Sequence, residues 1–526
     1  MYTLQSTQKL RMRRQFIVSK SNFHDVLFTL AFQSNYSEIK KFACDVILRW
    51  KCVQEEAETT MNRIIHESQD PSIKQLGQTI NNLRNQMNIL QKNVDLNELI
   101  QQLEQKELEL AHLSKAYQLY QNKASSQISD LQKLLPSNSA VIELKQYKRI
   151  NFETGQFEDI RLASALILPY SQSIILVDIG PMNNITLLFE MIRTVKNNKD
   201  RQAALKELYD RLFGAFDKHI KQAKNIYIAP DGLTHKIAFS RLVLPDGRFW
   251  IERQSLCFIQ TSRDLLDPGK PINRGTLVAM GGIDYNQFSE EAVKQKNRSY
   301  DSYGLQRSIK RTSEMIQSFN SLRFSKIEVE NIKIFYQHSQ QKTPLIFKGY
   351  NASEFQLKNL KEPPHVLHLS THGFYLEARE YETERPMLLS GLALAGCNRG
   401  LKGKKGPGNN DGILYAIEVA GLNLTGTELV VLSACDTGKG TIDYFEGVYG
   451  LIRAFRLAGA HKIMMTLWSL KDRSASDFLI SFYKLWMSKS NMDPLQALRQ
   501  TQLLFIKQNQ DSSLWAPYVM VVGNVQ

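Results

Sequence analysis

Two stretches of the sequence decide the fold: HVLHLSTHGFY, residues 365–375, and ELVVLSACDTGKG, residues 428–440. Each begins with a short apolar run typical of a buried strand and ends in a turn of small and polar residues. Ligands of an open parallel sheet bind beyond the carboxyl ends of its strands. If both runs are strands of such a sheet, His372 from the first turn and Cys435 from the second face one crevice.

Strand-like and helical segments alternate around these stretches from residue 135 onward. This alternation predicts an α/β fold with a mostly parallel sheet covered by helices. The expected strands are residues 140–144, 162–168, 173–179, 225–228, 276–280, 366–369, 428–432 and 462–467, and the expected helices include residues 187–195, 201–223 and 475–487.

The region before residue 135 has helical periodicity only. Apolar residues from Leu76 to Leu90 alternate between four- and three-residue spacing, which is typical of a coiled-coil seam. We expect an antiparallel helical hairpin, with a cofactor or partner groove as the alternative. The pattern ends at Leu135, because a residue that precedes a proline is disfavoured in the helical conformation.

The composition limits the classes of protein that the chain can belong to. Its five cysteines are scattered and form no CxxC pair, which argues against a disulfide framework and favours the cytoplasm. The start lacks the apolar segment of a signal peptide, and no uncharged apolar run reaches the roughly 18 residues of a membrane span. The net charge of +14 is spread along the chain, so we expect nucleic acid to bind only weakly or indirectly.

A cysteine and a histidine in one crevice can carry out nucleophilic catalysis at a carbonyl carbon. The histidine activates the thiol and then protonates the leaving amine. The backbone N–H groups of Gly373 and Cys435 are candidates for stabilising the oxyanion. Asp436 and Glu446 are candidates for binding a basic substrate side chain; their alternative roles are capping a turn and favouring a helix N-terminus.

Other residues are predicted to be structural. Zinc bound by His365, His368 and His372 is not expected, because residues 365 and 368 fall on opposite faces of a strand; His368 is expected to be buried and hydrogen-bonded. Residues 395–411, AGCNRGLKGKKGPGNND, predict a mobile surface loop with Cys397 as a candidate exposed thiol. This loop either controls access to the site or is an insertion without consequence.

The two stretches together resemble the CHAT family of caspase-like cysteine peptidases, in the clan of caspases and separases. The resemblance covers roughly residues 135–526. Residues 42–50 and the leucine-rich hairpin are similar to the segment that links tetratricopeptide repeats to such domains, although the repeats themselves are not recognisable. The matching segments are residues 226–266, 411–428, 446–472, 493–503 and 514–523.

The resemblance implies that His372 is the general acid/base and Cys435 the nucleophile. It implies an αβα sandwich of a pseudo-caspase half, residues 135–270, and a catalytic half, residues 271–526, after a helical region of residues 1–134. It also implies a protein substrate, no cofactor and no third catalytic group. We expect a regulatory protein to bind through the helical region. A non-catalytic helical scaffold with a caspase-like binding domain is the alternative.

Overall fold

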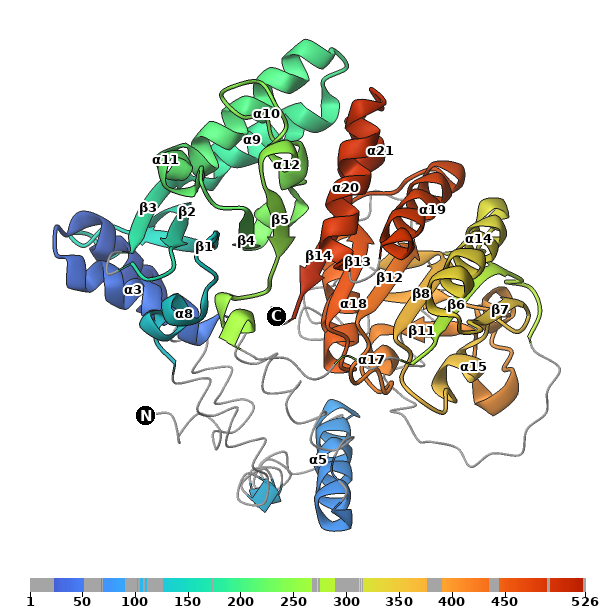
Figure 1. The fold of residues 1–526 in the computed structure, drawn as a ribbon. Helices are drawn as coiled ribbons and strands as arrows, with labels where there is room; N and C mark the ends of the chain where they lie inside the picture. Colours follow the sequence, from blue (N-terminus) through green and yellow to red (C-terminus); the bar gives the residue numbers. More distant parts are fainter. Residues whose placement is uncertain are drawn as a thin grey trace.

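The computed structural model describes residues 23–51, 68, 70–89, 102, 105–106, 109–110, 126–171, 174–266, 272, 275–288, 312, 314, 316–375, 390–434, 444–489 and 492–523. Two α/β halves lie side by side, the earlier part of the chain in blue and green and the later part in yellow to red (Figure 1). Helix α3 (Ser37–Trp50) lies on the outer flank of the first half.

One sheet runs through both halves. Its order in the described part of the chain is β3-β2-β1-β4-β5-β14-β13-β12-β8-β6-β7. Neighbours are parallel except at β1–β2, β2–β3 and β13–β14, which confirms the predicted α/β class. The strands are β1 (Ser139–Ile150), β2 (Phe157–Ile167), β3 (Ile175–Pro181), β4 (Asn225–Ala229), β5 (Ser255–Phe258), β6 (Leu277–Ile283), β7 (Leu345–Gly349), β8 (Val366–Thr371), β12 (Leu429–Ala434), β13 (Lys462–Thr466) and β14 (Tyr518–Val522).

A small antiparallel sheet continues from the end of β8. Its strands are β9 (Gly373–Tyr375), β10 (Ser390–Ala393) and β11 (Ile413–Tyr415), in the order β11-β10-β9. His372 alone separates β8 from β9, and its carbonyl accepts a hydrogen bond from the Ala393 N–H at 2.9 Å. The histidine backbone is therefore fixed where the two sheets meet.

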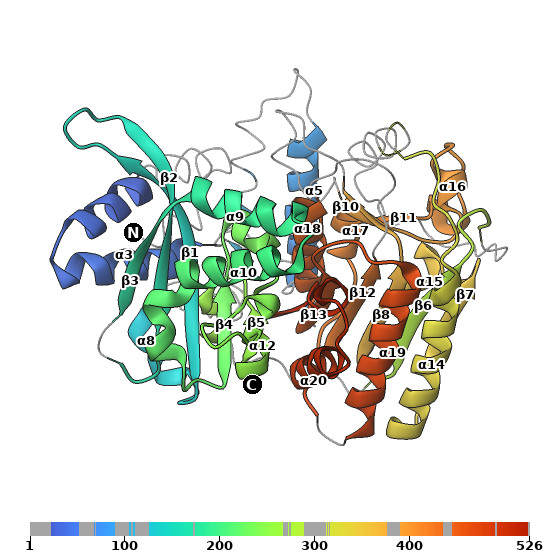
Figure 2. The same cartoon turned by 90° about the horizontal axis from the view of Figure 1, so that it is seen from above.

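Helices cover both faces of the second half. On one side of the strands, α19 packs between α14 and α20. Helices α17 and α18 lie on the other side (Figure 2). Residues 23–33 are also helical and precede α3 in the chain. The helices are α3 (Ser37–Trp50), α5 (Pro71–Ile89), α8 (Ile128–Leu134), α9 (Met182–Thr194), α10 (Asn198–Phe213), α11 (Asp217–Ile220), α12 (Trp250–Arg253), α14 (Arg323–Gln340), α15 (Glu354–Lys358), α16 (Cys397–Gly400), α17 (Ala416–Val419), α18 (Tyr444–Leu457), α19 (Asp472–Ser488), α20 (Pro494–Lys507) and α21 (Ser512–Trp515).

The helix α5 tests part of the predicted coiled-coil seam. Leu76, Ile80 and Leu83 are buried, as a seam requires. Residues 90–101 lie outside the described residues, so the helical hairpin stays a prediction. No helix in the described ranges is long and apolar enough to span a membrane.

Buried polar groups attach α3 to the first half. The Lys51 ammonium donates to Glu143 Oε2 at 2.9 Å and to the Ala229 carbonyl at 2.9 Å. The buried Arg263 guanidinium donates to the Leu48 and Lys51 carbonyls, which the end of the helix leaves without intrahelical partners. The end of α3 is therefore held by both charge and hydrogen bonding.

A second buried ion pair joins the two halves. Arg456, on α18, donates to both carboxylate oxygens of Asp264 at 3.1 and 3.2 Å, and to the Val522 carbonyl at 3.1 Å. The Asp264 side chain is almost fully buried, so removing its cationic partner is costly. The ion pair lies beside the junction of β5 and β14, where Phe258 faces Val521 in the sheet.

We expect Arg456→Met to lower the free energy of unfolding by about 3–5 kcal/mol, because it leaves the Asp264 carboxylate buried without its cation. Arg473→Met is the matched control, since the Arg473–Asp477 pair is exposed and should contribute less than about 1 kcal/mol. Urea denaturation followed by fluorescence measures both. Equal effects of the two substitutions would show that the buried pair does not stabilise the junction.

Candidate functional site

The strands β8 and β12 end level with each other. Their parallel register pairs Val366 with Leu429 and, five residues on, Thr371 with Ala434. Residues 366–371 are all buried, as expected for a strand covered on both faces. His372 is the next residue after β8 and so leaves the sheet at its carboxyl edge, where ligands bind in folds of this kind.

The predicted site residues differ in how far the structure describes them. His372 and Gly373 are described in full. Cys435 and Asp436 lie outside the described residues. Glu446 lies on α18, but its side chain is outside the described ones. The geometry of the site therefore comes from the histidine side of the crevice.

The His372 ring is held in one orientation and one tautomer. Its Nε2 lies 2.6 Å from the Asn320 carbonyl oxygen, which can only accept, so Nε2 carries the proton. In the neutral ring Nδ1 then has the lone pair. The rings of Tyr285 and Phe319 lie 5.2 and 5.6 Å away between centroids, and the histidine is only 3% exposed. This arrangement leaves Nδ1 as the ring nitrogen that can accept a proton.

The Asn320 carbonyl is a functional group that sequence reasoning missed. It takes the place of the carboxylate that orients a catalytic histidine in many enzymes. Because every residue has a backbone carbonyl, no pattern of side chains could have indicated it. Only the path of residues 316–322, which form neither helix nor strand, brings the carbonyl to the ring.

Gly373 has a backbone N–H that is directed away from the small sheet. Gly373 opposes Leu392 in β10, next to the hydrogen-bonded pair of His372 and Ala393. Hydrogen-bonded and non-hydrogen-bonded pairs alternate along antiparallel strands, so Gly373 is at a non-hydrogen-bonded position. Its N–H therefore points away from β10.

A carboxylate near His372 was also missed. Asp472 begins α19 and accepts the Phe324 N–H at 2.9 Å, in the first turn of α14. Burial raises the pKa of the Asp472 carboxyl, while the positive charge of His372 acts to lower that pKa.

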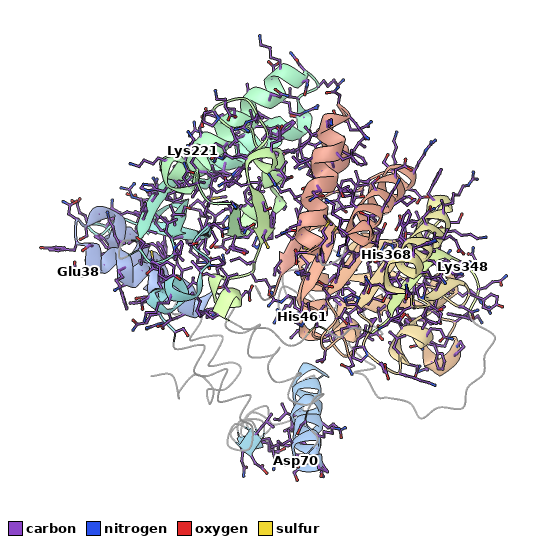
Figure 3. The ribbon with its side chains drawn as sticks, viewed as in Figure 1. Glu38, Asp70, Lys221, Lys348, His368 and His461 are labelled. Carbon is purple, nitrogen blue, oxygen red and sulfur yellow. The ribbon has the colours of Figure 1, made fainter. Side chains whose placement is uncertain are left out.

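His368 has a structural role, as predicted. It is fully buried; its Nε2 lies 2.7 Å from Glu328 Oε1 and its Nδ1 3.2 Å from the Tyr483 hydroxyl. Figure 3 shows His368 within the second half. His365 instead bonds Glu428 at 2.7 Å. In the described part of the chain, no three His, Cys, Asp or Glu side chains are grouped to hold a metal.

The predicted surface loop at residues 395–411 is only partly right. Residues 402–405, 408 and 409 are exposed, as a surface loop requires, whereas residues 395–398 are buried. Cys397 is 0% exposed, and burial raises the pKa of its thiol, so it is not the exposed thiol that the sequence suggested. Two glycines allow close packing of the backbone here. A Cβ on Gly400 would collide with the Asp411 carbonyl, and Gly412, at φ +82°, lies against the Cys397 backbone. Cys44 and Cys257 are buried too, as expected.

Buried carboxylates anchor the end of this segment. The Lys358 ammonium lies 2.7 Å from both Glu354 Oε1 and Glu418 Oε1. The second oxygen of Glu354 accepts the Gly412 N–H at 2.7 Å. Burial raises the pKa of Glu354 to about 8, and the negative charges of Glu418 and Asp411 act in the same direction. One ammonium is thus shared between two carboxyl groups.

Comparison with known proteins gives one family. Residues 202–524 match the family model described as CHAT domain. No curated protein matches the chain in sequence.

Two solved structures have limited similarity to this chain. The Saccharomyces cerevisiae separase–securin complex has a TM-score of 0.40 at 10% identity, over 97% of this chain and 40% of that one. The Arg-specific cysteine proteinase gingipain R has a TM-score of 0.33 at 7% identity, over 63% of this chain and 69% of that one. The chain thus spans about two fifths of the length of the separase chain.

The raised pKa of Glu354 predicts a pH dependence of stability. Because the folded-state pKa of about 8 exceeds the ordinary value of 4.5, the protonated carboxyl stabilises the fold at low pH, and this stabilisation is lost as the pH rises through about 8. We expect the Tm to fall between about pH 5 and pH 9, and Glu354→Gln to flatten that fall. The control Glu330→Gln, at an exposed carboxyl whose pKa is lowered, should leave the slope in this range unchanged. Equal slopes for Glu354→Gln and wild type would contradict the assignment.

Proposed function

Because the chain belongs to the CHAT domain family of caspase-like cysteine peptidases, we propose that it is an endopeptidase that cleaves protein substrates with His372 and Cys435. The observation that carries the proposal is the His372 ring, held by the Asn320 carbonyl with Nδ1 as its base. We assign the pseudo-caspase half to residues 135–270 and the catalytic half to residues 271–526, after the helical region of residues 1–134.

The register of β8 and β12 supports the pairing of His372 with Cys435. Thr371 and Ala434 are neighbours in the sheet, and each of the two reactive residues follows one of them directly in the chain. In the proposed arrangement, the histidine Nδ1 takes the thiol proton and leaves a thiolate–imidazolium pair.

The proposed reaction has two steps. The Cys435 thiolate attacks the scissile carbonyl carbon, and the carbonyl electron pair moves to oxygen, towards the N–H groups of Gly373 and Cys435. Collapse of this intermediate breaks the C–N bond while His372 gives its proton to the leaving amine. His372 then takes a proton from water, which attacks the thioester; the carboxyl product leaves and the thiolate is restored.

The proposal leaves two roles for acidic residues. Asp436 and Glu446 would bind a basic substrate side chain on the cysteine side of the crevice. The spread of basic residues along the chain gives no reason to propose a nucleic-acid substrate. We also place the protein in the cytoplasm, in keeping with the free cysteines Cys44, Cys257 and Cys397.

A regulatory protein is proposed to bind the N-terminal helices. In helical residues 23–33, Leu27, Phe28 and Ala31 are buried, whereas Phe23, Val26 and Leu30 are exposed on the other face. An exposed apolar stripe at helical spacing is suited to receive a partner helix.

Cys435→Ala should abolish cleavage of a fluorogenic peptide library and labelling by an electrophilic peptide ketone, because the attacking sulfur is gone. His372→Ala should lower cleavage at least about 100-fold, since the general base is lost. Cys397→Ala is the control and should keep full activity, because this buried thiol has no part in the reaction. Full cleavage by Cys435→Ala would exclude the mechanism. No cleavage or labelling by wild type, with or without cell extract, would favour the scaffold alternative.

The partner proposal predicts that cell extract accelerates probe labelling of wild type but not of Val26→Glu/Leu30→Glu. The introduced charges disrupt an apolar contact on the surface while the buried face of the helix stays intact. Lys199→Glu, on the exposed part of α10, is the control for added negative charge. If extract accelerates labelling of both the double variant and wild type, the partner does not bind this stripe.

A further inference from the structure

Asn398, on α16, has a buried side-chain amide. Both polar atoms of this amide form hydrogen bonds with the backbone of a single residue, Phe319. Asn398 is 7% exposed. Its Oδ1 accepts the Phe319 N–H at 2.8 Å, and its Nδ2 donates to the Phe319 carbonyl at 3.0 Å. Nδ2 also donates to Asn286 Oδ1 at 2.9 Å. Only this orientation of the amide works, because the opposite one would place an NH₂ group against the Phe319 N–H.

Phe319 needs such a partner because of its place in the chain. Residues 316–322 form neither helix nor strand, so their peptide groups lack the partners that a helix or sheet would supply. Buried backbone N–H and C=O groups must still be hydrogen-bonded. The amide of Asn398 fills this need in the way that a neighbouring strand would.

The groups that Asn398 holds are those that surround His372. Phe319 places its ring against the histidine and is followed by Asn320, whose carbonyl receives the Nε2–H. The Asn398 backbone N–H donates to the Tyr285 carbonyl at 2.9 Å, and Tyr285 is the other ring that contacts His372. One residue thus connects both rings and the orienting carbonyl.

We propose that Asn398 is a positioning residue for His372: it fixes the peptide of Phe319 and Asn320 so that the Asn320 carbonyl keeps the proton of the imidazole on Nε2. Helix α16, which carries Asn398, then braces the chain that surrounds His372. The kinetic consequence rests on the proposed function, whereas the effect on the tautomer does not.

The first test compares peptidase kinetics of Asn398→Asp, Asn398→Ser and Asn286→Ala. Asn398→Asp keeps the shape but loses both N–H donors and turns a carboxylate oxygen towards the Phe319 carbonyl. We expect kcat to fall about 10- to 100-fold in the Asn398 variants, because a small displacement of a catalytic group is costly, while KM stays within about two-fold. Asn286→Ala, which spares both bonds to Phe319, should stay within about three-fold of wild type. Asn398 variants that match Asn286→Ala in kcat and in the pH profile of kcat would overturn the proposal.

The second test needs no peptidase activity. In protein with ¹⁵N-labelled histidine rings, the His372 signal is assigned by its loss in His372→Gln. Wild type should show the neutral ring protonated at Nε2, and folded Asn398→Ser should show a mixture with the Nδ1–H form. An unchanged tautomer in the variants would overturn the positioning role. A changed tautomer in a chain that cleaves no peptide would support it while contradicting the proposed function.

Discussion

The hydrogen bond from His372 Nε2 to the Asn320 carbonyl is the constraint on which the site depends. A histidine acts as a base only at the ring nitrogen that lacks the proton, so the group that holds the proton decides which nitrogen can react. Here a backbone carbonyl holds it at 2.6 Å. The position of a backbone carbonyl is only as fixed as the chain segment that carries it. Residues 316–322 belong to neither a helix nor a sheet, so other contacts must hold them.

The rest of the fold supplies the missing rigidity. The fully buried strand β8 and the small sheet fix the His372 backbone on both sides. Asn398 bonds the irregular segment from behind, and Asp472 holds the start of α14, which follows that segment. Gly400 and Gly412 permit the start of the segment that carries Asn398 to pack directly against its end. The buried start of a segment that is rich in glycine and lysine therefore contributes to the support of the site.

The sequence predicts most of the strand framework, because buried strands appear as mainly apolar runs, but it does not indicate β5, β7 or β14. Residues 366–369 and 428–432 form β8 and β12 as expected, and His372 lies at the predicted sheet edge. The sequence does not predict what orients the histidine, because a backbone carbonyl has no residue type. It misled at Cys397, where glycines were taken as a sign of flexibility although they permit close packing. The roles proposed for Cys435, Asp436, Glu446 and the Gly373 N–H stay predictions.

The central claim is that His372 activates Cys435, and the most direct test is the rate of alkylation of that thiol. Iodoacetamide modification of Cys435, followed by mass spectrometry, separates this thiol from the other four cysteines. The account predicts rapid modification of wild type at pH 6, because a thiolate paired with an imidazolium persists there, and slow modification of His372→Gln at the same pH. Equal rates in the two proteins across the pH range would contradict it.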